Sequence, residues 1–372
     1  METARYSSAP LAFYRHPPDT PVPAHTAGAG ARRARKAFTR RRGDRSQLMR
    51  RAFQAGFILL NLWVGTQFYL FVRYYETAGA TLRVARPPGV EGWLPIAGLM
   101  NLKYLFDTGA MPASHPAGLV LLTAFLAMTL VFRKAFCSWL CPVGTVSEWL
   151  WQGGREIFGR NLVVPRPLDI PLRGLKYLLL WFFAWAIAHM TAADIVAFME
   201  SPYGMVADVK MLNFFRHLGQ TGAIVIAVLV VLSVFVKNVW CRFLCPYGAL
   251  LGLASLVSLT RIRRNPEACI DCAKCAKACP SQLPVDKLLS VRSVECTGCL
   301  ECVAACPAKG ALDLSAGRRP VPAQAVALGL AAIFLGFVAA AMLTGHWHTA
   351  LPDAVYFDLI PNASSLGHPG GY

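Results

Sequence analysis

Charged residues are scarce in this sequence of 372 residues. Only 15% are Asp, Glu, Lys or Arg, whereas soluble domains contain roughly 25%. In their place, 55% of the residues are hydrophobic and the mean hydropathy is +0.43. A buried core alone does not explain this deficit, because a soluble protein still needs a charged surface. The composition therefore excludes a typical soluble protein and favours helices that face lipid.

Acidic residues are especially few, since 20 Asp and Glu oppose 37 Lys and Arg and the formal net charge is +17. The position of this charge argues against nucleic acid as a partner. Ten Lys and Arg and one Asp lie between Arg32 and Arg51, directly before the first long apolar run. Such clusters stay on the cytoplasmic face and attract anionic lipid. We therefore expect residues 1–50 to form a basic, disordered cytoplasmic tail next to membrane lipid.

No cysteine lies outside four short motifs, although the chain contains twelve. Cysteines scattered in pairs would predict the disulfide framework of a secreted protein. Cysteines grouped at the spacing of metal ligands predict metal binding instead, by thiolates that the cytoplasm keeps reduced. The four motifs therefore contain the main candidate functional residues.

Two of the motifs have the spacing of a bacterial two-cluster ferredoxin. Residues 269–280 and 296–307 each read Cys-x-x-Cys-x-x-Cys-x-x-x-Cys-Pro. Three cysteines at this spacing can bind three corners of one [4Fe–4S] cluster, while the fourth reaches the other cluster. The predicted ligands are Cys269, Cys272, Cys275 and Cys306 for the first cluster, and Cys296, Cys299, Cys302 and Cys279 for the second.

The chief alternative for these two runs is zinc. Structural zinc sites use four ligands in two Cys-x-x-Cys pairs, and two runs that each end in Cys-Pro do not fit that pattern. Ala273, Ala276 and Gly298 are small, as expected where backbone N–H groups approach cluster sulfurs. We therefore predict two [4Fe–4S] clusters as cofactors.

The other two motifs share the pattern Cys-x-x-Leu-Cys-Pro-x-Gly at residues 137–144 and 241–248. Two cysteines four residues apart share one face of a helix, and a proline suits the start of the next helix. If the two motifs meet, their thiols could hold a third cluster or another metal, or form a redox dithiol. The alternative is small buried cysteines at tight helix junctions. The candidate residues are Cys137, Cys141, Cys241 and Cys245.

Weaker candidates lie near the predicted membrane surfaces. His189, Met190, His346 and His348 could belong to a quinol or haem site, or serve as interfacial anchors. Asp194, Glu200 and Asp208 could accept protons, although we expect them to solvate their loop. An aromatic belt at the inner interface is predicted for Trp139, Trp149, Phe243 and Tyr247.

Five apolar segments approach the ~20 residues that a membrane helix needs. They are residues 52–72, 117–132, 175–193, 221–236 and 321–344. Two shorter stretches, 93–106 and 247–260, suit interfacial helices. The loops that contain cysteines are rich in Lys and Arg, whereas no Lys or Arg follows Arg319. The positive-inside rule then places the N-terminus and the cysteine motifs in the cytoplasm and the C-terminus in the periplasm.

These patterns predict a mainly α fold. We expect a helical membrane bundle of about five transmembrane helices with an inserted small α+β ferredoxin domain that binds two [4Fe–4S] clusters. The expected parts are the tail 1–50, a four-helix membrane domain 51–260, the two-cluster domain 261–318, and the fifth helix with a short periplasmic tail, 319–372.

The chain resembles the membrane polyferredoxins of the NapH/NosR/CcoG-like superfamily. The resemblance is carried by the two Cys-x-x-x-Cys-Pro motifs and the two-cluster segment, and covers about residues 50–315. It implies a protein of the bacterial inner membrane that relays electrons between a quinone pool or a cytoplasmic donor and a membrane or periplasmic redox partner. A quinol-dehydrogenase-type subunit is one form of that activity. The alternative is an assembly or maturation factor that reduces a metal ion or the thiols of a metalloenzyme partner.

Overall fold

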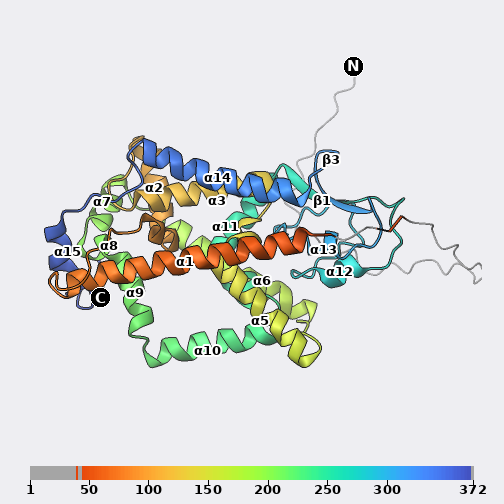
Figure 1. Cartoon of the computed structure of the whole chain (residues 1–372), viewed down its shortest axis with the longest axis horizontal. Coiled ribbons are helices and arrows are strands. Elements are labelled where there is room, and N and C mark those ends of the chain that lie inside the picture. The colour runs from red at the N-terminus through yellow and green to blue at the C-terminus, as the bar shows by residue number, and fades with distance from the viewer. Residues whose placement is uncertain (1–38, 41–43, 370–372) are drawn as a thin grey trace, which may run out of the picture. The chain divides into compact units, whose positions relative to one another are not determined.

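The computed structural model describes residues 39–40 and 44–369 (Figure 1). Most of the predicted basic tail, residues 1–38 and 41–43, lies outside the described residues. Helix α1 begins at Ser46, inside that predicted tail, and extends to Glu76. The helix therefore starts earlier than the hydropathy alone indicates.

Most of the described chain is helical. After α1 come η1 (Pro88–Trp93), α2 (Pro95–Thr108), α3 (Pro116–Phe132), α4 (Phe136–Trp139), α5 (Pro142–Phe158), α6 (Arg166–Ala188), α7 (Ala192–Met199), α8 (Pro202–Met205), α9 (Ala207–Arg216) and α10 (Gln220–Phe235). The rest are η2 (Trp240–Leu244), α11 (Pro246–Ala254), η3 (Ser255–Val257), α12 (Lys274–Ala278), α13 (Glu301–Ala304), α14 (Ala323–Leu343) and α15 (Asp353–Leu359).

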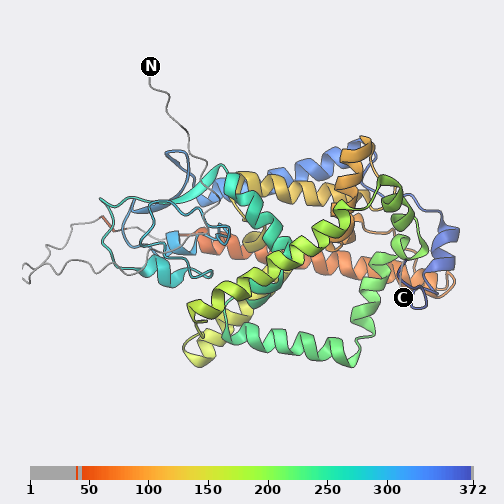
Figure 2. The same ribbon diagram turned by 180° about the vertical axis from the view of Figure 1, so that it is seen from behind.

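Among the described residues, three helices, α1, α6 and α14, are long and apolar enough to cross a membrane. Helices α9 and α10 would make a fourth span only as a pair, and the chain bends by 79° between them, as Figures 1 and 2 both show. Helix α3 matches the predicted span 117–132, but it has only 17 residues and most of its side chains are buried. The count of five spans therefore stays a prediction.

One hydrophobic core joins helices α3 and α14 to the cysteine-rich segment. It contains Ala124 and Met128 from α3 and Leu330 from α14, and it continues to Ile262 and Leu314 in the sheet. Helix α14 packs along α3. The predicted ferredoxin segment therefore shares its core with the helices that flank it.

The sheet closes the two ends of the ferredoxin segment. Strand β1 (Thr260–Arg264) pairs antiparallel with β2 (Leu312–Ala316), with Ile262 opposite Leu314. Strand β2 also pairs with the short β3 (Arg319–Pro320), which leads directly into α14. The pairing brings the start and the end of this segment side by side.

A buried ion network lies between η1, α3 and α9. The guanidinium of Arg86 bonds Glu91 and Asp208, each at 2.7 Å, and His115 lies 3.5 Å from Glu91. Burial alone would raise the pKa of Glu91, but the hydrogen bond to His115 and the charge of Arg86 lower it to about 2. Asp208 is 1% exposed, so the expectation that it solvates a loop was wrong, because pairing with Arg86 offsets the cost of its burial.

The contact of α5 with α10 depends on a glycine. A Cβ atom at Gly154 would lie 2.0 Å from the carbonyl oxygen of Val234, whereas a Cβ at Gly153 would meet nothing within 4 Å. We predict that Gly154→Ala lowers the free energy of unfolding by about 1–3 kcal/mol through overpacking. Gly153→Ala is the matched control and should be neutral or stabilising by up to ~1 kcal/mol. Thermal midpoints in detergent measure both, and equal midpoints would contradict the close approach.

Candidate metal centre

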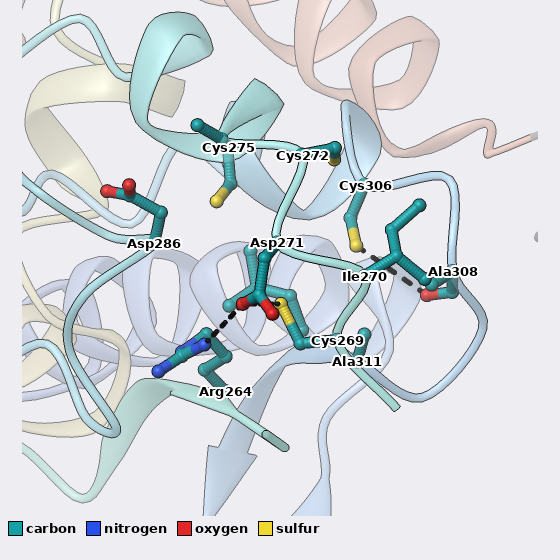
Figure 3. Close-up of a pocket in the computed structure, with 12 residues that line it drawn as sticks. Arg264, Cys269, Ile270, Asp271, Cys272, Cys275, Asp286, Cys306, Ala308 and Ala311 are labelled. Atoms are coloured by element: carbon teal, nitrogen blue, oxygen red, sulfur yellow. Dashed lines mark hydrogen bonds and ion pairs between the residues drawn. The ribbon is translucent and has the colours of Figure 1, made fainter. Parts of the chain in front are cut away.

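Four of the predicted ligands line one pocket. Cys269, Cys272, Cys275 and Cys306 line it together with Arg264 and Asp286, and Figure 3 shows their side chains around it. Cys272 is exposed, so this pocket lies at the surface of the ferredoxin segment.

The other four predicted ligands line a second pocket. Here Cys279 lies with Cys296, Cys299 and Cys302. The fourth cysteine of each run therefore lies in the pocket of the other run. Cys279, Cys296 and Cys302 are buried, so the cysteines of the second pocket are less exposed than those of the first.

The two runs fold in the same way. Asp271 and Gly298, which precede the second cysteine of each run, have φ angles of 53° and 63°. Ala273 and Leu300, which follow that cysteine, have φ angles of 54° and 61°, and the short helices α12 and α13 begin at the next residue. Ala273 is small, whereas Leu300 is large and buried. The two runs therefore share the backbone conformation at this position and not the size of the side chain.

Backbone N–H groups surround the thiols. Burial raises the pKa of Cys279, while hydrogen bonds from the N–H groups of Leu283 and Ser281 oppose this by favouring the thiolate. The N–H of Glu301 acts likewise on Cys299. Four thiols with N–H donors around a pocket fit the requirements of a [4Fe–4S] cluster. Within residues 39–40 and 44–369, no three Cys, His, Asp or Glu side chains form a site for a single metal ion.

A buried arginine connects the second pocket to the membrane helices. The side chain of Arg50 in α1 is 0% exposed and bonds both Glu148 of α5 and Glu301 of α13 at 2.6 Å. Nearby, the Gln47 amide donates to the carbonyl of Cys299. Burial raises the pKa of Glu301, and Arg50 opposes that increase. Arg50 falls in the tail that the sequence predicted to be disordered. Its structural role follows from its ion pairs with Glu148 and Glu301, which are distant in the sequence.

The chain just after α3 holds the loop of the second pocket. Arg133 donates to the carbonyl of Ser293, and Lys134 donates to that of Val294 at 3.2 Å. Further along, Ser138 Oγ donates to Thr297 O at 2.7 Å and Trp139 Nε1 donates to Gly298 O at 3.2 Å. These four donors thus bond four of the six carbonyls in residues 293–298. We call residues 133–139 the α3 corner.

Two of the aromatic residues predicted for an interfacial belt lie elsewhere. Trp139 is 0% exposed and Phe243 is 6% exposed, because the chain around both folds inward. Trp149 is 45% exposed, as a belt residue would be. The belt interpretation was therefore wrong for Trp139 and Phe243.

The Cys-x-x-x-Cys-Pro motifs form two similar corners. Cys137 lies in α4 and Cys241 in η2, whereas Cys141 and Cys245 precede α5 and α11 in extended conformation. The two cysteines of a motif thus do not share one helix face, because a following proline disfavours the helical conformation at the second cysteine. The prediction that each proline begins the next helix is confirmed.

The histidine candidates show no comparable organisation. His189 is exposed and its Nδ1 bonds the carbonyl of Trp185 in the same helix. His346 and His348 follow α14, in a separate part of the chain. These contacts fit the anchor interpretation better than a shared site.

Comparison with known proteins places two family models on the same segments. A 4Fe-4S binding domain matches residues 114–165 and 218–265, and a 4Fe-4S dicluster domain matches residues 261–307. No solved structure matches this chain.

Several curated proteins are similar in sequence. The "Putative electron transport protein YccM" of Escherichia coli is 52% identical over 86% of this chain and 91% of its own length. The methylamine utilization ferredoxin-type protein MauN of Paracoccus denitrificans is 34% identical over 45% of this chain and 56% of its own. The regulatory protein NosR of Pseudomonas aeruginosa is 32% identical over 44% of this chain, but that match covers only 23% of NosR.

Apolar helices of membrane-spanning length and two four-cysteine pockets define a membrane-associated iron–sulfur protein of the ferredoxin type. The match to the YccM protein covers 91% of that relative's length, and this extent identifies the family. The chain belongs to the NosR/NapH-like family of ferredoxin-type electron transport proteins.

The buried arginine gives a stability test. Arg50→Met leaves Glu148 and Glu301 without their cation, so we expect the free energy of unfolding to fall by about 3–5 kcal/mol. Arg51→Met is the matched control, because Arg51 is the next residue of α1 and is exposed. Thermal midpoints of the iron-loaded protein in detergent measure the difference. A similar shift in both variants would show that Arg50 contributes no more than a surface charge.

Proposed function

We propose that this chain relays electrons between a quinone pool or a cytoplasmic donor and a membrane or periplasmic redox partner. The observation that carries the proposal is the pair of pockets, each lined by four cysteines. In this proposal Cys269, Cys272, Cys275 and Cys306 hold one [4Fe–4S] cluster, and Cys296, Cys299, Cys302 and Cys279 hold the other. Clusters of this type supply one-electron chemistry over a wide range of potentials.

The different exposure of the pockets supports an order for the relay. Cys272 is exposed, so a soluble partner can approach the first pocket closely. The second pocket is bonded to the α3 corner through the loop 293–298. Electrons therefore exchange with the cytoplasm at the first pocket and with the membrane at the second.

As part of this proposal, the protein resides in the bacterial inner membrane. The cysteine motifs lie in loops rich in Lys and Arg, and the segment after Arg319 has neither. The positive-inside rule supports a cytoplasmic ferredoxin segment and a periplasmic C-terminus. The names "Putative electron transport protein YccM" and "Methylamine utilization ferredoxin-type protein MauN" agree with such a relay.

The ligand sets are tested by iron analysis of anaerobically purified protein in detergent. Cys272→Ala and Cys299→Ala should each remove about four irons and the matching sulfide relative to the wild type. Each should also remove one component of the EPR spectrum of the reduced protein. Lys274→Ala is the control, because this exposed residue lies between two cysteines of the first run and is not a predicted ligand. Bound zinc without acid-labile sulfide would refute the assignment.

The relay itself is tested by turnover. A quinol added anaerobically to the wild-type protein should reduce the clusters repeatedly when an electron acceptor is present. If a strong soluble reductant reduces the clusters and a quinol does not, electrons enter the relay from a cytoplasmic donor instead of the quinone pool. The alternative, a maturation factor, predicts neither repeated turnover nor a quinol requirement. In that case, loss of this protein would leave a partner enzyme without its metal.

A further inference from the structure

The turn between α5 and α6 lies beside the end of α10, as Figures 1 and 2 both show. We call residues 155–164 the α5–α6 turn. The ring of Phe158 packs against that of Phe235, the last residue of α10, with 5.1 Å between the ring centres. The N–H of Leu162 donates to the carbonyl of Phe235 at 2.8 Å. These contacts hold the turn at the level where α10 ends.

Helix α10 has the surface of a helix that is surrounded by lipid. All of its 16 residues are described, and only Ser233 is buried. A helix that is apolar on every side lies either in a protein core or in a membrane, and the exposure of α10 excludes the core. Phe235 therefore marks one edge of the hydrocarbon layer. The exposed apolar residues of α10 are Ile224, Val225, Val228, Val230, Val231 and Leu232.

The α5–α6 turn has the composition of a segment at a membrane surface. Ile157 is 76% exposed and Val163 is 72% exposed. They lie among the exposed cations Arg155 and Arg160, and the one acidic residue of the turn, Glu156, is also exposed. Exposed apolar side chains that reach into hydrocarbon, next to cations that stay among the headgroups, are typical of interfacial segments.

Two cations share one tryptophan where this turn begins. The guanidinium carbon of Arg155 lies 5.3 Å from the centre of the Trp151 ring, and Lys237 Nζ lies 5.1 Å from it. Trp151 is 2% exposed, so the ring is fixed by packing, and each cation is attracted to it. Lys237 follows the end of α10 by two residues. The ring therefore gathers two like charges at the edge of the hydrocarbon layer.

These two charges have no carboxylate of their own. Neither Arg155 nor Lys237 forms an ion pair with an Asp or Glu among the described residues. Burial lowers the pKa of Lys237 and the charge of Arg155 lowers it further, whereas Cys279 and Glu301 oppose this. Glu301, however, is already bonded to Arg50. An anion that contacts both cations would relieve their repulsion.

The surroundings of the two cations favour a phospholipid as the source of that anion. Arginine can bond two phosphate oxygens at once, and lysine binds phosphate as a point charge. A free phosphate ion would match these charges but would leave Ile157 and Val163 without a partner. An acidic protein would have to displace the lipid around α10. A lipid with a net negative headgroup satisfies the cations and the apolar side chains together.

We propose that Arg155 and Lys237 bind the phosphate of an anionic phospholipid at the end of α10, while Ile157 and Val163 contact its acyl chains. Arg160 adds to the positive charge beside the headgroup. Bound lipid would fix the α5–α6 turn at the bilayer surface. This inference requires α10 to lie in a bilayer and does not depend on the electron relay proposed above.

The double variant Arg155→Gln/Lys237→Met tests the two cations. Native mass spectrometry of the full chain in detergent compares the binding of phosphatidylglycerol with that of phosphatidylcholine. The wild type should prefer phosphatidylglycerol, and the variant should bind it about 10–30-fold more weakly, because two charges near the headgroup are lost. Lys274→Gln/Lys277→Gln is the control, since it removes two exposed charges of α12. No preference in the wild type, or equal losses in both variants, would overturn the site.

The apolar side chains provide a second test. Ile157→Asn/Val163→Asn should weaken the binding of long-chain phosphatidylglycerol and leave that of the dihexanoyl form unchanged. Leu289→Asn is the control, because Leu289 is 62% exposed and belongs to the ferredoxin segment. Equal effects on both chain lengths would overturn the contact with acyl chains. Displacement of the lipid by inorganic phosphate or by polyglutamate would overturn the lipid as occupant, in favour of a free anion or an acidic protein.

Discussion

The contact of the α3 corner with the loop 293–298 is the constraint on which the rest of the arrangement depends. Donors from Arg133, Lys134, Ser138 and Trp139 bond four carbonyls of that loop. A glycine suits position 298, because a Cβ there would lie only 3.0 Å from the carbonyl oxygen of Phe132. The same few residues thus end helix α3, hold the loop of the second pocket and include Cys137. A shift of this corner would move both groups of thiols together.

Electrostatics makes the same connection at longer range. Arg50 pairs with carboxylates of α5 and α13, and Lys176 pairs with Glu295 beside Cys296. Each pair joins a long apolar helix to the ferredoxin segment through a buried charge. Buried pairs add little net stability compared with apolar packing, but they are strongly directional. They therefore determine where the segment sits on the helices more than how stable it is.

Local patterns predicted much of the site. Cysteine spacing predicted which thiols line each pocket, and the prolines predicted where α5 and α11 begin, because both depend on a few adjacent residues. The burial of Trp139, Asp208 and Arg50 could not be predicted in this way. Each is buried by a partner more than eighty residues away in sequence, and a single sequence does not reveal such pairs. Local charge and aromaticity instead favoured an exposed position for all three.

The shared core has a consequence for how the protein is made. Residues of α3 and α14 pack in one continuous core with Ile262, Val291 and Leu314 of the cysteine-rich segment. Helix α14 follows that segment in the chain, so this core is complete only after α14 has been synthesised. The cysteine-rich segment therefore reaches its final packing late in synthesis, when the last of the long apolar helices docks on α3.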